Sequence, residues 1–215
     1  MAATEQVILV DENDTPIGTA EKLEAHRNAL RHRAFSVFVL RFRSVAKIKY
    51  KAKHKAKEHS ARHTINEINA ENEAEYEILL QQRAQKKYHS PNLWTNTCCS
   101  HPRPNEDIIE AGKRRLKEEM GFILPLQDIG QFHYIAHFDN GLTENEIDHV
   151  LVGTLNRDLS NNENILPNPA EVQAYCWMTI TELKNELKNN PQQYTPWLSM
   201  ALEIIGSKIQ MLPNR

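Results

Sequence analysis

Residues 94–122 read WTNTCCSHPRPNEDIIEAGKRRLKEEMGF and bring sulfur, imidazole, carboxylate and guanidinium groups into one short stretch. A Cys-Cys pair is followed by His101, two residues after the second cysteine. The remainder predicts a helix, because Asn105 is a favourable N-cap, acidic residues follow it, and Gly121 is a natural stop. We therefore expect a loop with metal-ligating side chains that leads directly into a charged helix.

Two faces of that helix differ in character. An apolar stripe at helical spacing predicts a buried face, formed by Ile109, Leu116 and Met120. Arg115, Glu118 and Glu119 lie three and four residues apart and share another face. Two carboxylates beside an arginine can hold a hard cation and a phosphate together. A solvated charged face is the simpler interpretation of a glutamate pair alone. The spacing of the surrounding residues therefore has to distinguish a solvated face from a binding site.

The spacing of the stretch resembles the Nudix box, G-x5-E-x7-R-E-U-x-E-E-x-G-U, in which U is apolar. The positions that match are Glu106, Arg114, Leu116, Glu118, Glu119, Gly121 and Phe122. Two positions depart from the box: Ser100 stands in place of its glycine and Arg115 in place of a glutamate. The box spacing favours metal and diphosphate binding over a solvated surface.

Four stretches extend the resemblance over nearly the whole chain. They are HRAFSVFV from residue 32, TNTCCSHP from residue 95, ENEID from residue 144 and TPW from residue 195. Together they resemble the type I isopentenyl diphosphate isomerases of the Nudix superfamily. The resemblance implies a fold of the α/β (α+β) class, a Nudix-type α/β/α sandwich with a mixed sheet. It also implies a single domain over residues 1–215, with an insertion at about 44–76.

Local patterns predict the other elements of the chain. A turn-rich segment at 11–16 predicts a hairpin between the first two strands. Thr179 and Glu182 form a capping box for one helix. Thr195 is expected to cap the last helix, with Pro196 at its first position and Gly206 near its end. The expected strands lie at 7–10, 17–19, 35–42, 78–80, 129–137 and 174–178, and one more follows a turn within GLTENEIDHVLVGTL, residues 141–155.

Composition limits the class of protein. The 215 residues carry a formal net charge of −2, with 40% hydrophobic and 25% charged residues. These values are typical of a soluble globular protein and indicate neither a nucleic-acid nor a membrane partner. No apolar run approaches the roughly 20 residues of a membrane span, and the acidic N-terminus lacks a signal-peptide layout. Because the cysteines are only Cys98, Cys99 and Cys176, we expect a reducing, cytoplasmic setting. We expect a monomer or a weak homodimer.

Charged residues occupy every second position in two parts of the insertion at 44–76. Lysines occupy every second position from 47 to 57, and glutamates every second position from 71 to 77. This period belongs to strands, and an antiparallel hairpin would place the lysine row opposite the glutamate row. A partly helical or disordered tip stays an alternative, because the segment is rich in Ala, Lys and Glu. The acidic return arm argues against a nucleic-acid role for the lysines.

Histidines and glutamates outside the box are candidate metal ligands. His26 and His32 are six residues apart, so we expect them on a loop or at the ends of elements rather than on one helix face. A lone histidine is usually structural, whereas this pair together with His101 makes metal binding an equal alternative. Glu144 and Glu146 share one strand face, which is unfavourable unless a cation or solvent screens them. A solvent-facing edge strand explains that pair equally well.

Beyond these patterns, the family resemblance implies a reaction and the residues that perform it. The reaction is the interconversion of isopentenyl diphosphate and dimethylallyl diphosphate through a carbocation-like species, in isoprenoid biosynthesis. Cys99 and Glu146 are implied as its acid and base, in either order. Tyr134 is implied as a hydrogen-bond partner of the catalytic glutamate. The ring of Trp197 is implied to face the cation.

The resemblance also implies how a small-molecule prenyl diphosphate and its metals are held. Basic side chains that suit phosphate oxygens are implied for the diphosphate, namely Lys22, Arg83, Lys87 and Arg115. A Mg2+ ion is implied at Glu119 and the backbone carbonyl of Cys99. A second divalent metal, Mn2+ or Zn2+, is implied at a mixed nitrogen and oxygen site made of His26, His32, His101, Glu144 and Glu146.

Two other functions stay open. A Nudix hydrolase of nucleoside or prenyl diphosphates would need the complete box, which Arg115 interrupts, and would not need Cys99. A non-catalytic diphosphate- or metal-binding module would tolerate the loss of Cys99, Glu146 or Tyr134, yet all three are present. An arginine in place of the box glutamate removes a metal ligand and adds a phosphate partner. That exchange favours holding a diphosphate over cleaving it.

Overall fold

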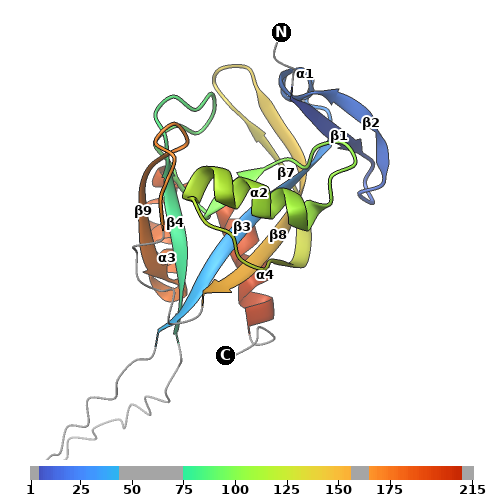
Figure 1. Cartoon of the computed structure of the whole chain (residues 1–215). Helices are drawn as coiled ribbons and strands as arrows, with labels where there is room; N and C mark the ends of the chain where they lie inside the picture. Colours follow the sequence, from blue (N-terminus) through green and yellow to red (C-terminus); the bar gives the residue numbers. More distant parts are fainter. Residues whose placement is uncertain (1–4, 44–74, 156–164, 210–215) are drawn as a thin grey trace, which may run out of the picture.

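The computed structural model describes residues 5–43, 75–155 and 165–209. Figure 1 shows the arrangement of its elements around a strongly twisted sheet. The strands are β1 (Gln6–Val10), β2 (Pro16–Glu21), β3 (His32–Arg43), β4 (Glu75–Arg83), β5 (Trp94–Thr95), β6 (Cys98–Ser100), β7 (Gln127–His137), β8 (Thr143–Leu155) and β9 (Val172–Thr179). The helices are α1 (Lys22–Arg27), α2 (Ile108–Met120), α3 (Ile180–Asn189), the short 3-10 helix η3 (Pro191–Gln193) and α4 (Leu198–Lys208).

The sheet is mixed, and one parallel pair lies at its centre. β3 runs parallel to β8, from His32 opposite Glu146 to Arg41 opposite Leu155. The pairs β1–β2, β1–β3, β3–β4, β3–β6, β4–β5, β4–β9 and β7–β8 are antiparallel. The first residues of β3 therefore meet the first part of β8, although the two strands are far apart in the sequence. The hairpin predicted from residues 11–16 is present as β1 and β2.

Helices cover both faces of the sheet, as Figure 1 shows for α2 on the near side and α4 behind it. Alternate residues of β3 point to opposite faces. Phe35 packs in one core cluster with Leu116 of α2, and Phe38 packs in another with Leu198 of α4. All four side chains are fully buried, and each contributes about 2 kcal/mol by leaving water. The layers confirm the predicted α/β/α sandwich with a mixed sheet.

The start predicted for α2 is wrong by two residues, whereas its end is confirmed. Asp107 caps the helix, and its carboxylate accepts hydrogen bonds from the backbone N–H groups of Ile109 and Glu110 at 2.9 and 3.1 Å. Asn105 instead adopts a left-handed conformation with φ of 66°, which asparagine tolerates better than most residues. Both residue types are good caps, so the backbone decides between them. Gly121 ends the helix with φ of 86°.

The last helix also begins later than predicted. α4 starts at Leu198, and no side-chain hydrogen bond caps it. The hydroxyl of Thr195 lies 2.9 Å from that of Thr95 and is engaged there instead. Gly206 lies near the end of α4, as predicted, two residues before its last residue, Lys208. The capping box predicted for α3 is present.

The insertion leaves the sheet between β3 and β4. The last described residue pair is Arg43 opposite Glu75, in antiparallel register. The hairpin predicted for residues 44–76 lies, beyond this pair, outside the described residues. None of the helices in the described part of the chain is long and apolar enough to cross a membrane.

Candidate active site

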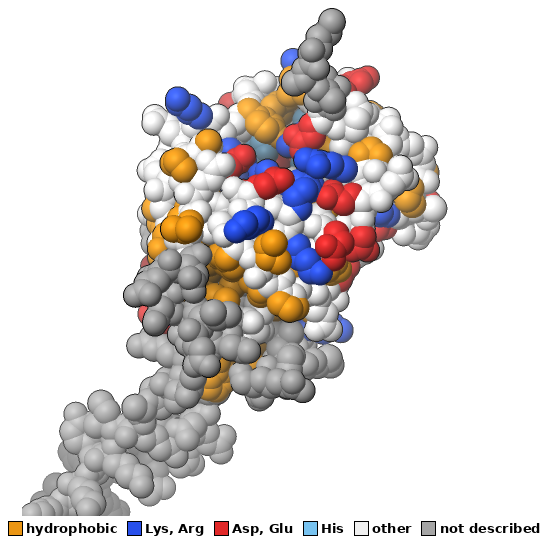
Figure 2. All heavy atoms as spheres, in the orientation of Figure 1, with side chains coloured by type: hydrophobic (Ala, Val, Ile, Leu, Met, Phe, Trp, Pro, Cys, Tyr) orange, Lys and Arg blue, Asp and Glu red, His pale blue; other side chains and the backbone are white. Residues whose placement is uncertain are grey.

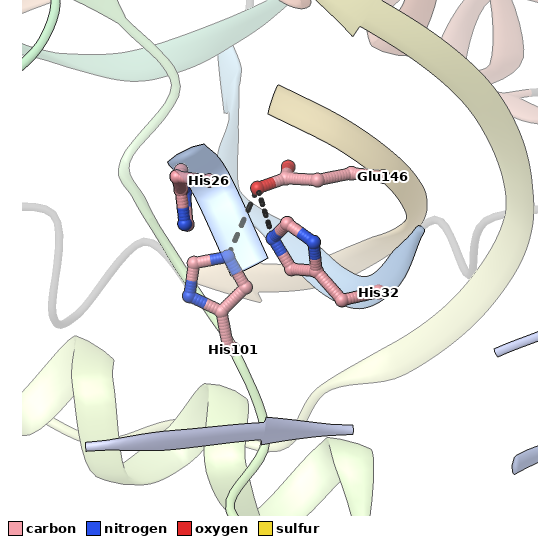
Figure 3. Close-up of side chains that lie close together, drawn as sticks. All are labelled: His26, His32, His101 and Glu146. Carbon is pink, nitrogen blue, oxygen red and sulfur yellow. Dashed lines mark hydrogen bonds and ion pairs between the residues drawn. The ribbon is translucent and has the colours of Figure 1, made fainter. Parts of the chain in front are cut away.

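Three histidines and a glutamate meet where β3 and β8 begin (Figure 3). His32 is the first residue of β3 and stands opposite Glu146 in the parallel register. His26 comes from the last turn of α1, and His101 follows β6. Figure 3 shows the three rings around the carboxylate, whose Oε1 lies 2.9 Å from Nε2 of His101 and 3.2 Å from Nε2 of His32. One ligand atom from each of the four residues lies within 4.8 Å of the others.

The ring nitrogens of this cluster fit a divalent cation. Nδ1 of His26 and Nδ1 of His32 each donate to a backbone carbonyl at 2.7 Å, that of Lys22 and that of Leu30. Nε2 is then the lone-pair nitrogen of each ring. Nε2 of His26 is buried and has no hydrogen-bond partner among the described residues, and Nε2 of His32 faces Oε1 of Glu146 at 3.2 Å. A carbonyl on the other ring nitrogen is the usual support of a metal-ligating histidine, and an unpartnered buried nitrogen is otherwise unfavourable.

Burial favours the neutral, metal-binding form of two of these imidazoles, His26 and His101. Burial, followed by the charge of His32, lowers the pKa of His26. Burial lowers the pKa of His101 to about 3, although Glu146 acts in the opposite direction. Neutral imidazole is the form that ligates metals. Imidazole and carboxylate together suit a borderline metal rather than a purely oxygen-seeking one.

Two glutamates and a tyrosine lie beside the histidines. The hydroxyl oxygen of Tyr134 is 2.7 Å from Oε2 of Glu146 and 2.9 Å from Oε2 of Glu144. Burial, and then the charge of Glu146, raises the pKa of Glu144 well above its usual range. Burial also opposes the ionisation of Glu146, but the neighbouring rings of His101 and His32 outweigh it and hold the pKa of Glu146 well below its usual range. The two pKa values shift in opposite directions, so Glu144 is the more readily protonated member of the pair.

Asp148 continues the same face of β8 and was missing from the predicted site. It lines the same cavity, and its Oδ2 accepts a hydrogen bond from the hydroxyl of Ser36 at 2.8 Å. Burial and the charge of Glu146 raise the pKa of Asp148 well above its usual range. The signal that could have found it is the alternation Glu144, Glu146, Asp148, which has the period of a strand.

Cys99 and Trp197 border the cavity that the glutamates line. Nη1 of Arg83 lies 3.5 Å from Sγ of Cys99. Burial raises the pKa of Cys99 to about 12, against the opposing effect of Arg83, so the thiol is protonated at neutral pH. Trp197 is fully buried, and its indole N–H donates to Oδ1 of Asn96 at 3.0 Å. A protonated thiol, an ionised carboxylate and an indole face thus share one small space.

The four predicted diphosphate-binding cations line this cavity as well: Lys22, Arg83, Lys87 and Arg115. In Figure 2, basic and acidic side chains lie next to one another on the face that carries α2. Lys87 and Arg115 both form ion pairs with Glu171, just before β9, and Lys22 pairs with Glu5. Glu171 was missed because it lies 84 residues from Lys87, and no local pattern links them.

Glu119, the implied Mg2+ ligand, lies outside the cavity that His101 and the other two glutamates line. It is 2% exposed and is not among the residues that line the cavity. Its carboxylate accepts a hydrogen bond from Nε2 of Gln81 at 2.9 Å and pairs with Arg115 of the same helix. Glu119 is therefore connected to the cavity through Arg115 rather than directly.

Comparisons with known proteins show the family to which the chain belongs. A family model described as "NUDIX domain" matches residues 57–198, about two thirds of the chain, so the chain belongs to the Nudix family. The "Isopentenyl-diphosphate Delta-isomerase" of Photobacterium profundum is 39% identical over 211 residues, which cover 97% of this chain and 98% of that protein. The protein of the same name from Burkholderia multivorans is 38% identical, covering 94% and 93% of the two chains. Within the Nudix family, this chain thus belongs to the isopentenyl-diphosphate Delta-isomerases.

A solved structure supports the fold alone. The crystal structure of DR0079 from Deinococcus radiodurans aligns with a TM-score of 0.58 and covers 93% of this chain and 98% of that one. Because the two sequences are only 16% identical, the likeness shows a shared architecture and not a shared reaction.

Proposed function

We propose that this protein is the isomerase that its curated relatives are named for, interconverting isopentenyl diphosphate and dimethylallyl diphosphate. The observation that carries the proposal is the content of one cavity. A thiol, two glutamates and a tyrosine border it, together with cationic side chains that suit a diphosphate. A diphosphate is held there next to groups that can move protons at carbon.

The reaction moves two protons and no other atoms. One proton adds to the terminal carbon of the double bond, which leaves a tertiary carbocation, and another proton leaves the neighbouring methylene. Cys99 and Glu146 are the proposed acid and base. One holds a proton and the other has a free lone pair, as their opposite pKa shifts indicate. Their roles exchange when the reaction runs backwards. Tyr134 contacts both glutamates and can pass a proton between them.

Trp197 is proposed to stabilise the positive charge that develops on carbon. Its ring lies 6.1 Å from that of Tyr134, and the guanidinium carbon of Arg83 lies 5.6 Å from the indole centroid. Indole attracts cations more strongly than the other aromatic rings do. The burial of Trp197 also keeps water away from a carbocation that water would capture.

The diphosphate is proposed to bind Lys22, Arg83, Lys87 and Arg115. Two of these cations, Lys87 and Arg115, pair with Glu171 in the structure, so phosphate oxygens would replace that carboxylate. The cavity itself is about 40 Å³, room for very few water molecules. A five-carbon diphosphate therefore has to displace side chains at its edge, of which Tyr88 is the most exposed.

Two divalent metals are proposed. His26, His32, His101, Glu144 and Glu146 would hold one, Mn2+ or Zn2+, and the unpartnered ring nitrogens support this. Glu119 and the carbonyl of Cys99 would hold Mg2+ beside the diphosphate. A bound cation supplies positive charge that keeps nearby carboxylates ionised and neutralises phosphate charge.

Further proposals concern the whole chain. We propose a single domain over residues 1–215 that carries the insertion at 44–76. The free cysteines support a cytoplasmic setting, in which thiols stay reduced. The formal net charge of −2 supports the absence of a nucleic-acid partner. A monomer or a weak homodimer is proposed.

An isomerisation assay tests the function. Purified protein receives isopentenyl diphosphate with Mg2+ and Mn2+, and both the acid-labile allylic product and released phosphate are followed. We expect allylic product without phosphate. We expect Cys99→Ala to lower turnover by about a thousandfold, as loss of a proton-transfer residue does. Cys176→Ala is the matched control, because Cys176 lies on β9 and does not line the cavity.

Each outcome of this assay has one meaning. Product from wild type and Cys176→Ala, but not from folded Cys99→Ala, supports the isomerase and the role of the thiol together. Phosphate without allylic product would identify a Nudix hydrolase, which Arg115 in place of the box glutamate argues against. Neither product from folded, metal-supplied protein would leave a binding module.

A further inference from the structure

His89 lies at the metal centre although neither the box spacing nor the family resemblance points to it. It sits in the loop between β4 and β5, and only 8% of its surface is exposed. Its Nε2 lies 3.2 Å from Oε1 of Glu144. Ligand atoms of His26, His89 and Glu144 lie within 4.8 Å of one another and form a second group adjacent to the first. We propose that His89 supplies a fourth imidazole to the divalent-metal centre, on the side of Glu144.

The geometry favours a ligand over a packing residue. The rings of His89 and His26 lie 28° from parallel, with centroids 6.2 Å apart. Because their ligand atoms lie within 4.8 Å of one another, one cation is within reach of both rings and of Glu144. His26 belongs to both groups of candidate ligands, which makes them two sides of one centre rather than two separate sites.

The loop that carries His89 is held in place from two directions. Arg83 donates from Nη2 to the carbonyl of His89 at 3.2 Å and from Nε to that of Ser90 at 3.1 Å. The side chain of Asn140, between β7 and β8, donates to the carbonyl of Tyr88 at 2.7 Å. The ring of His89 also packs against that of Phe138, at a centroid distance of 5.3 Å. A ligand on a braced loop meets the ion with little further loss of conformational freedom.

A fourth imidazole has a chemical consequence. Imidazole suits zinc and cobalt, whereas carboxylate and water suit magnesium and manganese. His89 should therefore increase the preference of the centre for the more nitrogen-seeking metals. Its removal should weaken Zn2+ and Co2+ binding more than Mn2+ binding.

Metal titration tests the proposal without reference to activity. Co2+ is titrated into metal-free wild type, His89→Ala and His89→Gln while its visible absorption is recorded. Zn2+ and Mn2+ affinities are obtained by competition with a chelator. We expect both variants to bind Co2+ and Zn2+ about tenfold or more weakly, with an altered Co2+ spectrum, and Mn2+ only a few-fold more weakly. His137→Ala is the matched control, because His137 is exposed on β7 and bonds Thr143 instead of the cluster.

The variants separate a ligand from a structural histidine. Glutamine can still donate to Glu144, so wild-type Co2+ affinity in His89→Gln would show a hydrogen-bonding role and overturn the proposal. Equal losses of melting temperature with and without Co2+ in His89→Ala, at unchanged affinity, would overturn it as well. Should His89→Ala fail to fold, His89→Gln alone decides.

This inference rests on the metal centre of the proposed function, yet the two can fail separately. Wild-type protein that binds Co2+ as expected but forms no allylic product would refute the isomerase and leave the role of His89 supported. An active isomerase whose His89 variants keep wild-type affinities and spectra would refute the role of His89 alone.

Discussion

Two clusters of histidines and carboxylates lie on opposite faces of the same parallel strand pair, β3 and β8. On one face, His32 meets Glu146 in the candidate metal centre, where buried ring nitrogens have no hydrogen-bond partner among the described residues. On the other face, His149 lies between two carboxylates. Its Nε2 is 2.9 Å from Oδ2 of Asp14, and its Nδ1 is 2.7 Å from Oδ2 of Asp128.

The difference between the clusters lies in their partners, not in their residue types. Asp14 also accepts a hydrogen bond from Nε of Arg33 at 2.8 Å, so the His149 cluster balances its charges internally. It needs no ligand and holds the β1–β2 hairpin against the sheet. The other cluster directs lone pairs into a buried space that fits a cation. Counting partners therefore distinguishes a candidate site from a structural cluster where residue composition cannot.

The largest effect is expected for a substitution at the candidate metal centre, which should nearly abolish isomerisation, whereas the His149 cluster should not affect it. Glu146→Gln keeps the size of the side chain and its contact with Tyr134, but removes the charge that the imidazoles and a cation require. We expect isomerisation to fall by about a thousandfold and divalent-metal affinity to fall with it. The turnover rate and a Co2+ titration of the same preparation measure both.

The matched control is a substitution to glutamine in the other cluster, at His149. His149→Gln removes one cation there and should leave turnover and Co2+ affinity within about twofold of wild type. Substantial isomerisation by folded Glu146→Gln would remove that residue from the proposed acid–base pair. A comparable loss in His149→Gln would show that the two faces are coupled.

Short-range patterns in the sequence were enough for the parts of the site that lie in one motif. The box spacing placed Arg115 beside Glu119, and their ion pair is present. The period of two placed Glu144 and Glu146 on one face, and both are buried there. Gly121 ended its helix as predicted, because a left-handed stop depends on one residue.

Pairings between distant strands and loops were not accessible from such patterns. That His32 would stand opposite Glu146 depends on the parallel register of β3 and β8, which no local spacing encodes. His89 reaches the site through a loop whose path is fixed by Arg83 and Asn140. The same limit explains Asn105, a good cap by residue type, which lost that position because of its backbone conformation.

A smaller effect concerns stability and its dependence on pH in the His149 cluster. Burial alone would lower the pKa of His149, but its hydrogen bonds to Asp128 and Asp14 outweigh burial and raise it. The contribution of a group whose pKa is raised on folding is fully present below the unfolded pKa of about 6.5 and is lost as the pH rises through the folded value. Wild type should therefore exceed His149→Gln in unfolding free energy by roughly 1 kcal/mol at low pH, and by less at high pH.

Urea denaturation at pH 6 and at pH 9 measures this difference. Comparing the two proteins at each pH cancels the titration of the other histidines, including those of the metal centre. A gap that grows from pH 6 to pH 9 would contradict the assigned direction of the pKa shift. A gap that is absent at both values would show that the cluster contributes nothing to stability.

The smallest effect is expected for the insertion, which belongs to neither cluster. Arg43 and Glu75 stand opposite each other in antiparallel register, so a two-residue Asn-Gly turn in place of residues 44–74 joins β3 to β4 without moving either strand. The charged sequence of the segment predicts a solvated surface rather than a buried contact, and surface ion pairs contribute little each. We expect turnover, Co2+ affinity and the stability gap of His149→Gln to stay within about twofold of the full chain, the usual range for surface changes. A collapse of turnover in the folded, shortened protein, with Co2+ affinity intact, would instead place part of the insertion in contact with substrate, because the metal centre would then be unaffected.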